Sequence, residues 1–81
     1  MTTIRAMWPD GHEHVATTWR GLERAMREEQ WHRYGRIGFR REMARRAMVW
    51  SGTRIHWTGS SWSFVHELER AGMLRLEEED R

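Results

Sequence analysis

Six tryptophans stand in a chain of 81 residues that contains no cysteine. A chain of this length buries only about 60% of the surface that its unfolded state exposes, so its hydrophobic core is small. Without cysteine, no disulfide or thiolate-bound metal reinforces that core. Each indole ring brings a large apolar area, so several tryptophans must belong to the core. Six are more than one small core hides, and the remaining rings predict a surface that binds a partner.

Composition and charge are typical of a soluble globular protein. Hydrophobic residues make up 38% of the chain and charged residues 32%, which suits a soluble globular protein better than a disordered or membrane-bound one. No apolar run reaches the roughly 18 residues of a membrane span, and the first seven residues do not resemble a secretion signal. We therefore expect one domain over residues 1–81, located in the cytoplasm.

Turn and capping signals predict a hairpin followed by helices. Residues 3–8 and 12–16 flank Pro9-Asp10-Gly11, which forms a tight turn, and this pattern predicts a β-hairpin in which Ala6 faces His14. The first helix begins after Thr17 or Thr18 and ends near Trp31. Two glycines, Gly35 and Gly38, break the chain before a second helix at 39–50. A third helix is expected at 61–71, ended by Gly72.

Two further strands complete the predicted fold. Residues 53–57 alternate in character and place Ile55 and Trp57 on one side, and residues 73–77 form the last strand. These two strands are joined through a helix, so they are able to lie parallel. The predicted fold class is α+β: a small single domain of order β-β-α-α-β-α-β, with an N-terminal hairpin and three helices on a small sheet.

Apolar residues at helical spacing predict the core. In the second helix one stripe contains Phe39, Met43, Ala47 and Trp50. In the first helix Glu23 is expected on the solvent side, where it would pair with Arg27 one turn later. Six residues are expected to meet in the core: Leu22, Met26, Phe39, Met43, Val65 and Leu68.

Basic charge is concentrated in the middle of the chain. Residues 31–57 hold seven arginines against Glu42 alone, a net charge of +6, whereas residues 58–81 carry −3. Arg40, Arg41 and Arg45 are expected outside the apolar stripe of their helix. Such a basic band can bind an acidic protein face or phosphates, or it can pair with the protein's own carboxylates. The sequence leaves these alternatives open.

Motifs for catalysis or for a cofactor are lacking. The serines stand in turn or capping contexts, and none lies in a Gly-x-Ser-x-Gly sequence. His12 and His14 share one face of a strand, but a metal site requires at least a third ligand, so we expect them at the surface or in the turn. The sequence therefore predicts no catalytic residues, no metal and no cofactor, and a protein that is not an enzyme.

Residues 60–74, SSWSFVHELERAGML, resemble the end of a winged helix-turn-helix domain. In that family a recognition helix closes with a similar Leu-Glu-x-Ala-Gly-Leu sequence and a strand follows. A recognition helix presents basic or amide side chains to the bases, whereas this helix offers Ser61, Ser63, His66, Glu67 and Glu69. An acidic segment follows at 77–80. We therefore interpret the helix and strand as structural.

Over most of its length the chain resembles small orphan accessory proteins of actinobacterial bacteriophages. The resemblance rests on the Trp-Pro-Asp-Gly turn at 8–11, RREMARRA at 40–47, VWSGTR at 49–54 and ELERAGM at 67–73. It implies a role in the cytoplasm of the infected cell, often interference with a host protein. The resemblance carries no catalytic residues.

The leading functional hypothesis is a non-enzymatic phage-type protein that binds a bacterial host protein and alters its activity. The alternative is nucleic-acid binding by the basic band at 33–54, with arginines on phosphates and an aromatic ring on the bases. The sequence leaves a monomer and a homodimer open. Tryptophan and arginine dominate binding hot spots, so the candidate partner-binding residues are Arg33, Tyr34, Arg36, Arg40, Arg41, Arg45, Arg54, Trp31 and Trp62.

Overall fold

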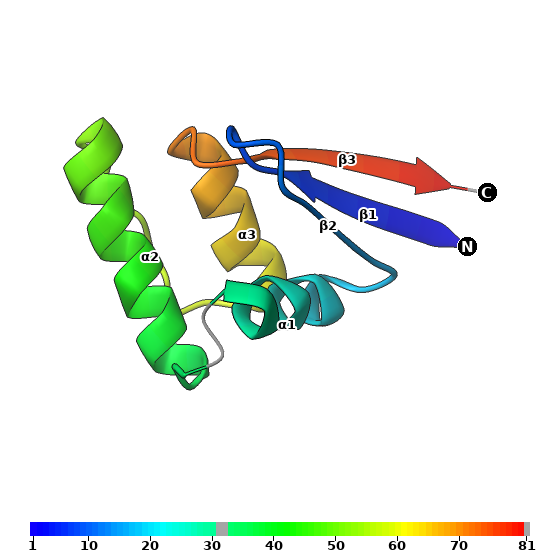
Figure 1. Cartoon of the computed structure of the whole chain (residues 1–81), viewed down its shortest axis with the longest axis horizontal. Coiled ribbons are helices and arrows are strands. Elements are labelled where there is room, and N and C mark those ends of the chain that lie inside the picture. The colour runs from blue at the N-terminus through cyan, green and yellow to red at the C-terminus, as the bar shows by residue number, and fades with distance from the viewer. Residues whose placement is uncertain (31–32, 81) are drawn as a thin grey trace.

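A computed structural model describes residues 1–30 and 33–80. Two strands come first along the chain, three helices follow, and one strand comes last (Figure 1). This arrangement confirms the predicted α+β class, with an N-terminal hairpin. The elements are β1 (Thr2–Met7), β2 (Glu13–Ala16), α1 (Trp19–Gln30), α2 (Arg36–Ser51), α3 (Ser61–Arg70) and β3 (Arg75–Asp80).

The N-terminal hairpin has the predicted register. Ala6 lies opposite His14 in the antiparallel pair of β1 and β2. The turn closes with a hydrogen bond from the Trp8 amide to the His12 carbonyl. Gly11 adopts a φ of 94°, a conformation that costs glycine nothing and explains why glycine occupies this position.

The last strand differs from the prediction in its position, and its partner is β1 rather than a strand at 53–57. β3 covers 75–80 rather than 73–77, and it pairs antiparallel with β1, so that the sheet order is β2-β1-β3. The chain reverses at Gly72, whose φ is 78°. Met73 and Leu74 then turn into the core, so strand pairing begins only at Arg75. The acidic residues of 77–80 therefore form the edge strand instead of a free end.

The strand predicted at 53–57 is absent, because α2 and α3 side chains bind its backbone groups. The His56 amide donates to the Glu67 carboxylate at 2.9 Å, and the Arg54 carbonyl accepts from Arg70 at 2.9 Å. Since side chains satisfy these groups, the segment has no need of a neighbouring strand. The predicted alternation is still correct, with Ile55 buried and Trp57 packed against the core.

Glu67 gives this segment a dependence on pH. Hydrogen bonds from Arg70 and from the His56 amide lower the pKa of Glu67 from 4.5 to about 2. Unfolding returns this carboxyl to its ordinary pKa. Its contribution to stability is therefore present in full above about pH 4.5 and is lost as the pH falls towards 2.

We expect the stability difference between wild type and Glu67→Gln to be large at pH 7 and to shrink between pH 4.5 and 2. Urea denaturation across this range measures the difference. A difference that stays constant with pH would contradict the bonding of Glu67.

The three helices begin and end close to the predicted positions. Thr18 caps α1 by accepting the Gly21 amide, and Ser60 caps α3 by accepting the Ser63 amide. Gly52 ends α2 in the left-handed conformation, with a φ of 68°. Gly38 does not break the chain as predicted. It lies inside α2, where a Cβ atom would come within 3.3 Å of the Tyr34 ring.

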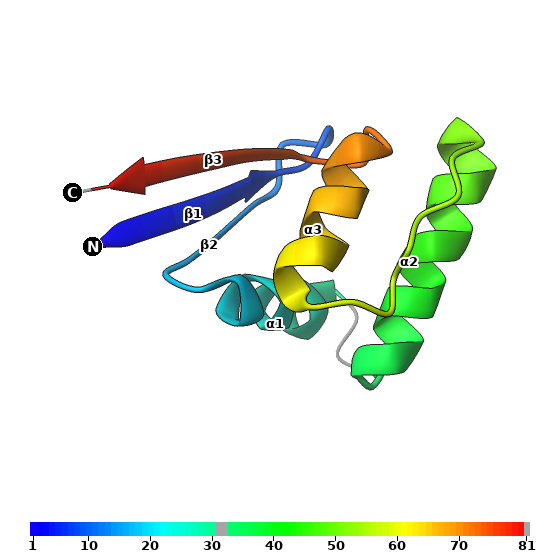
Figure 2. The same ribbon diagram turned by 180° about the vertical axis from the view of Figure 1, so that it is seen from behind.

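The core lies where the helices meet the sheet. Helices α1 and α3 pack on the strands, while α2 packs against α3 on the side away from the chain termini (Figures 1 and 2). All six predicted core residues are at most 1% exposed. They are joined by Phe64, which meets Phe39 edge to face. Of the tryptophans, Trp8, Trp19 and Trp57 pack at the margin of this core.

Leu68 tests the core assignment. Its side chain is fully buried in the last turn of α3, so Leu68→Ala leaves a cavity and should cost about 2–5 kcal/mol of stability. A melting curve identical to that of the wild type would refute this placement.

Candidate protein-binding groove

The predicted basic band does not form one surface, because Arg40 is buried. Arg40 and Glu23 form an ion pair between α2 and α1 in which both side chains are about 3–4% exposed. The prediction that Arg40 projects to solvent as a binding residue is therefore wrong. The predicted pair between Glu23 and Arg27 is wrong for the same reason, since the Glu23 carboxylate is engaged by Arg40.

The Arg40 guanidinium connects four parts of the fold. Its Nε and Nη2 atoms donate to the two oxygens of Glu23, each at 2.7 Å. Its Nη1 atom donates to the carbonyls of Trp57 and Gly59, and its carbon lies 4.9 Å from the centre of the Phe64 ring. Ser61 also donates to Glu23. This network fixes α1, α2 and α3 around residues 52–60, which connect α2 to α3.

Burial alone would raise the pKa of Glu23. The hydrogen bonds from Arg40 and Ser61 outweigh burial and lower the pKa of Glu23 below its ordinary value. The carboxylate is thus charged at neutral pH, and the pair is a true ion pair inside the protein. Its role is structural, because the bonds occupy both carboxylate oxygens.

The other predicted binding residues are exposed where the structure describes them. Trp62 is 53% exposed on the first turn of α3, where it stacks on His66 at 4.0 Å. Trp31 lies outside the described residues. Exposure is a condition for binding and does not by itself test it. The exposed candidates are Arg33, Tyr34, Arg36, Arg41, Arg45, Arg54 and Trp62.

A surface feature that the sequence did not reveal lies at the end of α2. Trp50 was expected to be buried with Phe39, Met43 and Ala47, because the four share one stripe. Trp50 is instead 66% exposed, although the other three are buried. It lies one turn beyond the last layer of the core. Met48 and Val49, on the outer sides of the same turn, are exposed as well, so the end of α2 is apolar all round.

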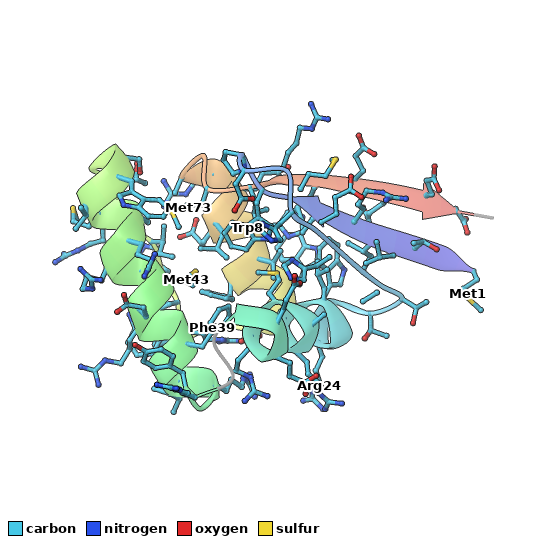
Figure 3. All side chains as sticks on the ribbon, in the orientation of Figure 1. Met1, Trp8, Arg24, Phe39, Met43 and Met73 are labelled. Carbon is cyan, nitrogen blue, oxygen red and sulfur yellow. The ribbon has the colours of Figure 1, made fainter. Side chains whose placement is uncertain are left out.

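Trp50 forms one wall of a groove of about 420 Å³, which we call the Trp50 groove. Met43 and Arg46 of α2 line the same wall, residues 8–10 of the hairpin turn form a second, and residues 71–73 after α3 form the third. Figure 3 labels Trp8, Met43 and Met73, which approach this space from three parts of the chain. The Arg46 guanidinium lies 5.5 Å from the centre of the Trp50 ring. The groove is thus mainly apolar, with the Arg46 cation on one wall and the Asp10 carboxylate on another.

A buried histidine holds the hairpin wall of the groove. Trp8 donates its indole N–H to Nδ1 of His14 at 3.0 Å, while Nε2 of His14 contacts the Glu29 carboxylate of α1. The expectation that His14 lies at the surface or in the turn is therefore wrong. Because His14 fixes the Trp8 ring, this wall is formed before any ligand arrives.

The hairpin histidine His12 and the serines before and at the start of α3 have structural hydrogen bonds. His12 bonds to Asp10 in the hairpin turn, and Ser60 and Ser61 have the capping and bridging roles given above. In residues 1–30 and 33–80, no three His, Asp or Glu side chains gather as metal ligands do. None of the helices in these ranges has the length and apolar character that a bilayer span requires.

No protein-family model, no curated protein and no solved structure matches this chain.

Proposed function

We propose that this protein is a non-enzymatic binding module that docks a segment of another protein in the Trp50 groove. The main support for the proposal is the exposure of Trp50, whose ring forms one wall of the mainly apolar Trp50 groove. An exposed tryptophan costs solubility, and tryptophan is the residue type most enriched in binding hot spots. Met48 and Val49 extend the apolar area beyond the groove.

Charge indicates what kind of segment binds there. Helix α2 carries five arginines and one glutamate. Among the described residues, Arg40 pairs with the buried Glu23, and Glu42 is shared between Arg45 and Arg46. Arg41 and Arg45 are exposed on the outward side of the helix. The complementary partner is a segment with an apolar anchor side chain flanked by Asp or Glu.

The resemblance to phage accessory proteins supports a bacterial host protein as the partner, met in the cytoplasm of the infected cell. Binding would alter the activity of that protein by occupying one of its acidic and apolar segments. Binding of this kind requires no catalytic group from the chain.

Selection from a random peptide library tests the proposal without knowledge of the partner. Peptides are selected on the wild-type protein and counter-selected on Trp50→Asp. We expect peptides that share an aromatic or leucine anchor and flanking acidic residues. A selection that yields no peptide discriminating the two proteins would contradict the proposal.

Sedimentation of the wild type and of Trp50→Asp completes the test. If the wild type forms a dimer that Trp50→Asp dissolves, then the groove receives a second copy of this chain, and the proposal of a different protein partner is wrong. We expect both proteins to sediment as monomers.

A further inference from the structure

A second recess lies between α1 and the start of α2, and its walls are arginines. Arg20, Arg24 and Arg27 come from α1, Arg36 comes from α2, and the recess measures about 300 Å³. Glu23 and Ser61 complete its lining. We call it the arginine recess. It is distinct from the Trp50 groove, since Arg36 and Trp50 are separated by about 21 Å along α2.

Helix geometry explains why the arginines converge. Positions 20, 24 and 27 follow one another at intervals of four and three residues, so they form one stripe on α1. Arg24 points away from the body of the protein at the outer side of α1 (Figure 3). The ion pair between Glu23 and Arg40 ties α2 to α1 beneath this stripe and brings Arg36 to its edge.

The charges of the recess are not balanced within the described chain. None of the four arginines forms an ion pair with a carboxylate of residues 1–30 and 33–80. Arg27 donates to the Tyr34 carbonyl at 3.5 Å, which is a weak bond. The one carboxylate in the recess, Glu23, already receives Arg40 and Ser61. Four like charges thus share one small space around an acid that is already neutralised.

We propose that the arginine recess binds a compact phosphate group, either a phosphomonoester or a pyrophosphate. Guanidinium groups bind phosphate oxygens through paired, charge-assisted hydrogen bonds, and they keep their charge at every physiological pH. A bound dianion would relieve the repulsion among the four arginines. The part of the lining that residues 1–30 and 33–80 supply contains no aromatic ring, so these residues offer no stacking surface for a base. This favours a compact anion over a nucleic acid strand.

Calorimetric titration of the whole protein with sodium pyrophosphate tests the site, first at low and then at physiological ionic strength. We expect saturable binding with one pyrophosphate per chain. Arg24→Gln with Arg36→Gln should weaken it by about tenfold or more, since each change removes a charge-assisted bond. Arg20→Gln with Arg24→Gln provides a second pair confined to α1. The altered side chains Arg20, Arg24 and Arg36 are exposed, so the variants should remain folded, as circular dichroism verifies.

Arg41→Gln with Arg45→Gln is the matched control, because it removes the same charge from the outward side of α2. This control should bind pyrophosphate as the wild type does. An equal loss of affinity in the control and recess variants would overturn the proposal, because binding would then follow net charge alone. Binding that fails to saturate would also overturn it. A single-stranded oligonucleotide is titrated in parallel, and tighter binding of the oligonucleotide than of pyrophosphate would assign the arginines to nucleic acid instead.

Discussion

Replacing Arg40 by methionine should lower the free energy of unfolding by about 3–5 kcal/mol. The substitution keeps much of the side-chain length but removes the guanidinium, so the Glu23 carboxylate remains buried without its counter-charge. The carbonyls of Trp57 and Gly59 lose their donor as well. Domains of this size are stable by only about 5–15 kcal/mol. Chemical denaturation should therefore show a large fall in the midpoint.

Arg41→Met is the control for this prediction. Arg41 is the next residue along α2 and is exposed, so its replacement should change stability by no more than about 0.5 kcal/mol. Glu23→Leu combined with Arg40→Met should recover part of the loss, because neither charge is then buried alone. If Arg40→Met proved as stable as Arg41→Met, the pair would have no structural role.

Trp50→Asp should weaken binding of the selected acidic peptides about 30- to 1000-fold, the effect of losing a hot spot worth about 2–4 kcal/mol. The change removes the ring that walls the groove and places a carboxylate where the acidic partner must lie. Fluorescence anisotropy of labelled peptides measures the loss. The melting temperature should hardly move, because Trp50 is 66% exposed in the folded chain.

Trp62→Asp separates the groove from the other exposed tryptophan. Trp62 lies at the start of α3, whereas the groove lies beyond its end, about 12 Å along the helix axis. Peptide affinity should survive Trp62→Asp. The opposite result, with binding lost in Trp62→Asp and kept in Trp50→Asp, would place the interface at the start of α3.

The hairpin and the core are predictable from the sequence because their signals are local. Pro9-Asp10-Gly11 determines the turn, and the turn determines that Ala6 faces His14. The spacing of Leu22 and Met26, or of Phe39 and Met43, shows which side of each helix faces inward. These patterns depend on neighbours within two turns, and the structure has them as expected.

The interactions of the buried ion pair and of residues 53–57 join parts of the chain that are far apart in the sequence. Arg40 lies at the edge of the apolar stripe of α2, so the sequence predicts that it is exposed to solvent. It is buried because folding places Glu23, 17 positions earlier in the chain, beside it. Residues 53–57 have the composition of a strand. Their hydrogen bonds go to Glu67 and Arg70 instead, and no local rule indicates that side chains will replace a neighbouring strand.

The groove and the recess were missed for a related reason. Helical periodicity places Trp50 on the side of α2 that faces the core. It does not show how far along α2 the rest of the protein covers that side, and at Trp50 the side chain is exposed. The arginines of α1 lie within residues 1–30, whose net charge is slightly negative. A count of charge by segment therefore did not reveal that these arginines form one stripe. A helical-wheel reading of Arg20, Arg24 and Arg27 would have found that stripe. The approach of Arg36 required the tertiary structure.

The most direct test of the central claim is photo-cross-linking from the end of α2. A photo-reactive amino acid replaces Val49, which is exposed beside Trp50, and in a control protein it replaces Val15, which is exposed on β2. We predict that position 49 yields an adduct with a protein partner, that excess wild-type chain prevents the adduct, and that excess Trp50→Asp chain does not. The partner is then purified and must bind the wild type directly. An adduct that Trp50→Asp prevents equally well, or that position 15 forms just as readily, would contradict docking in the Trp50 groove.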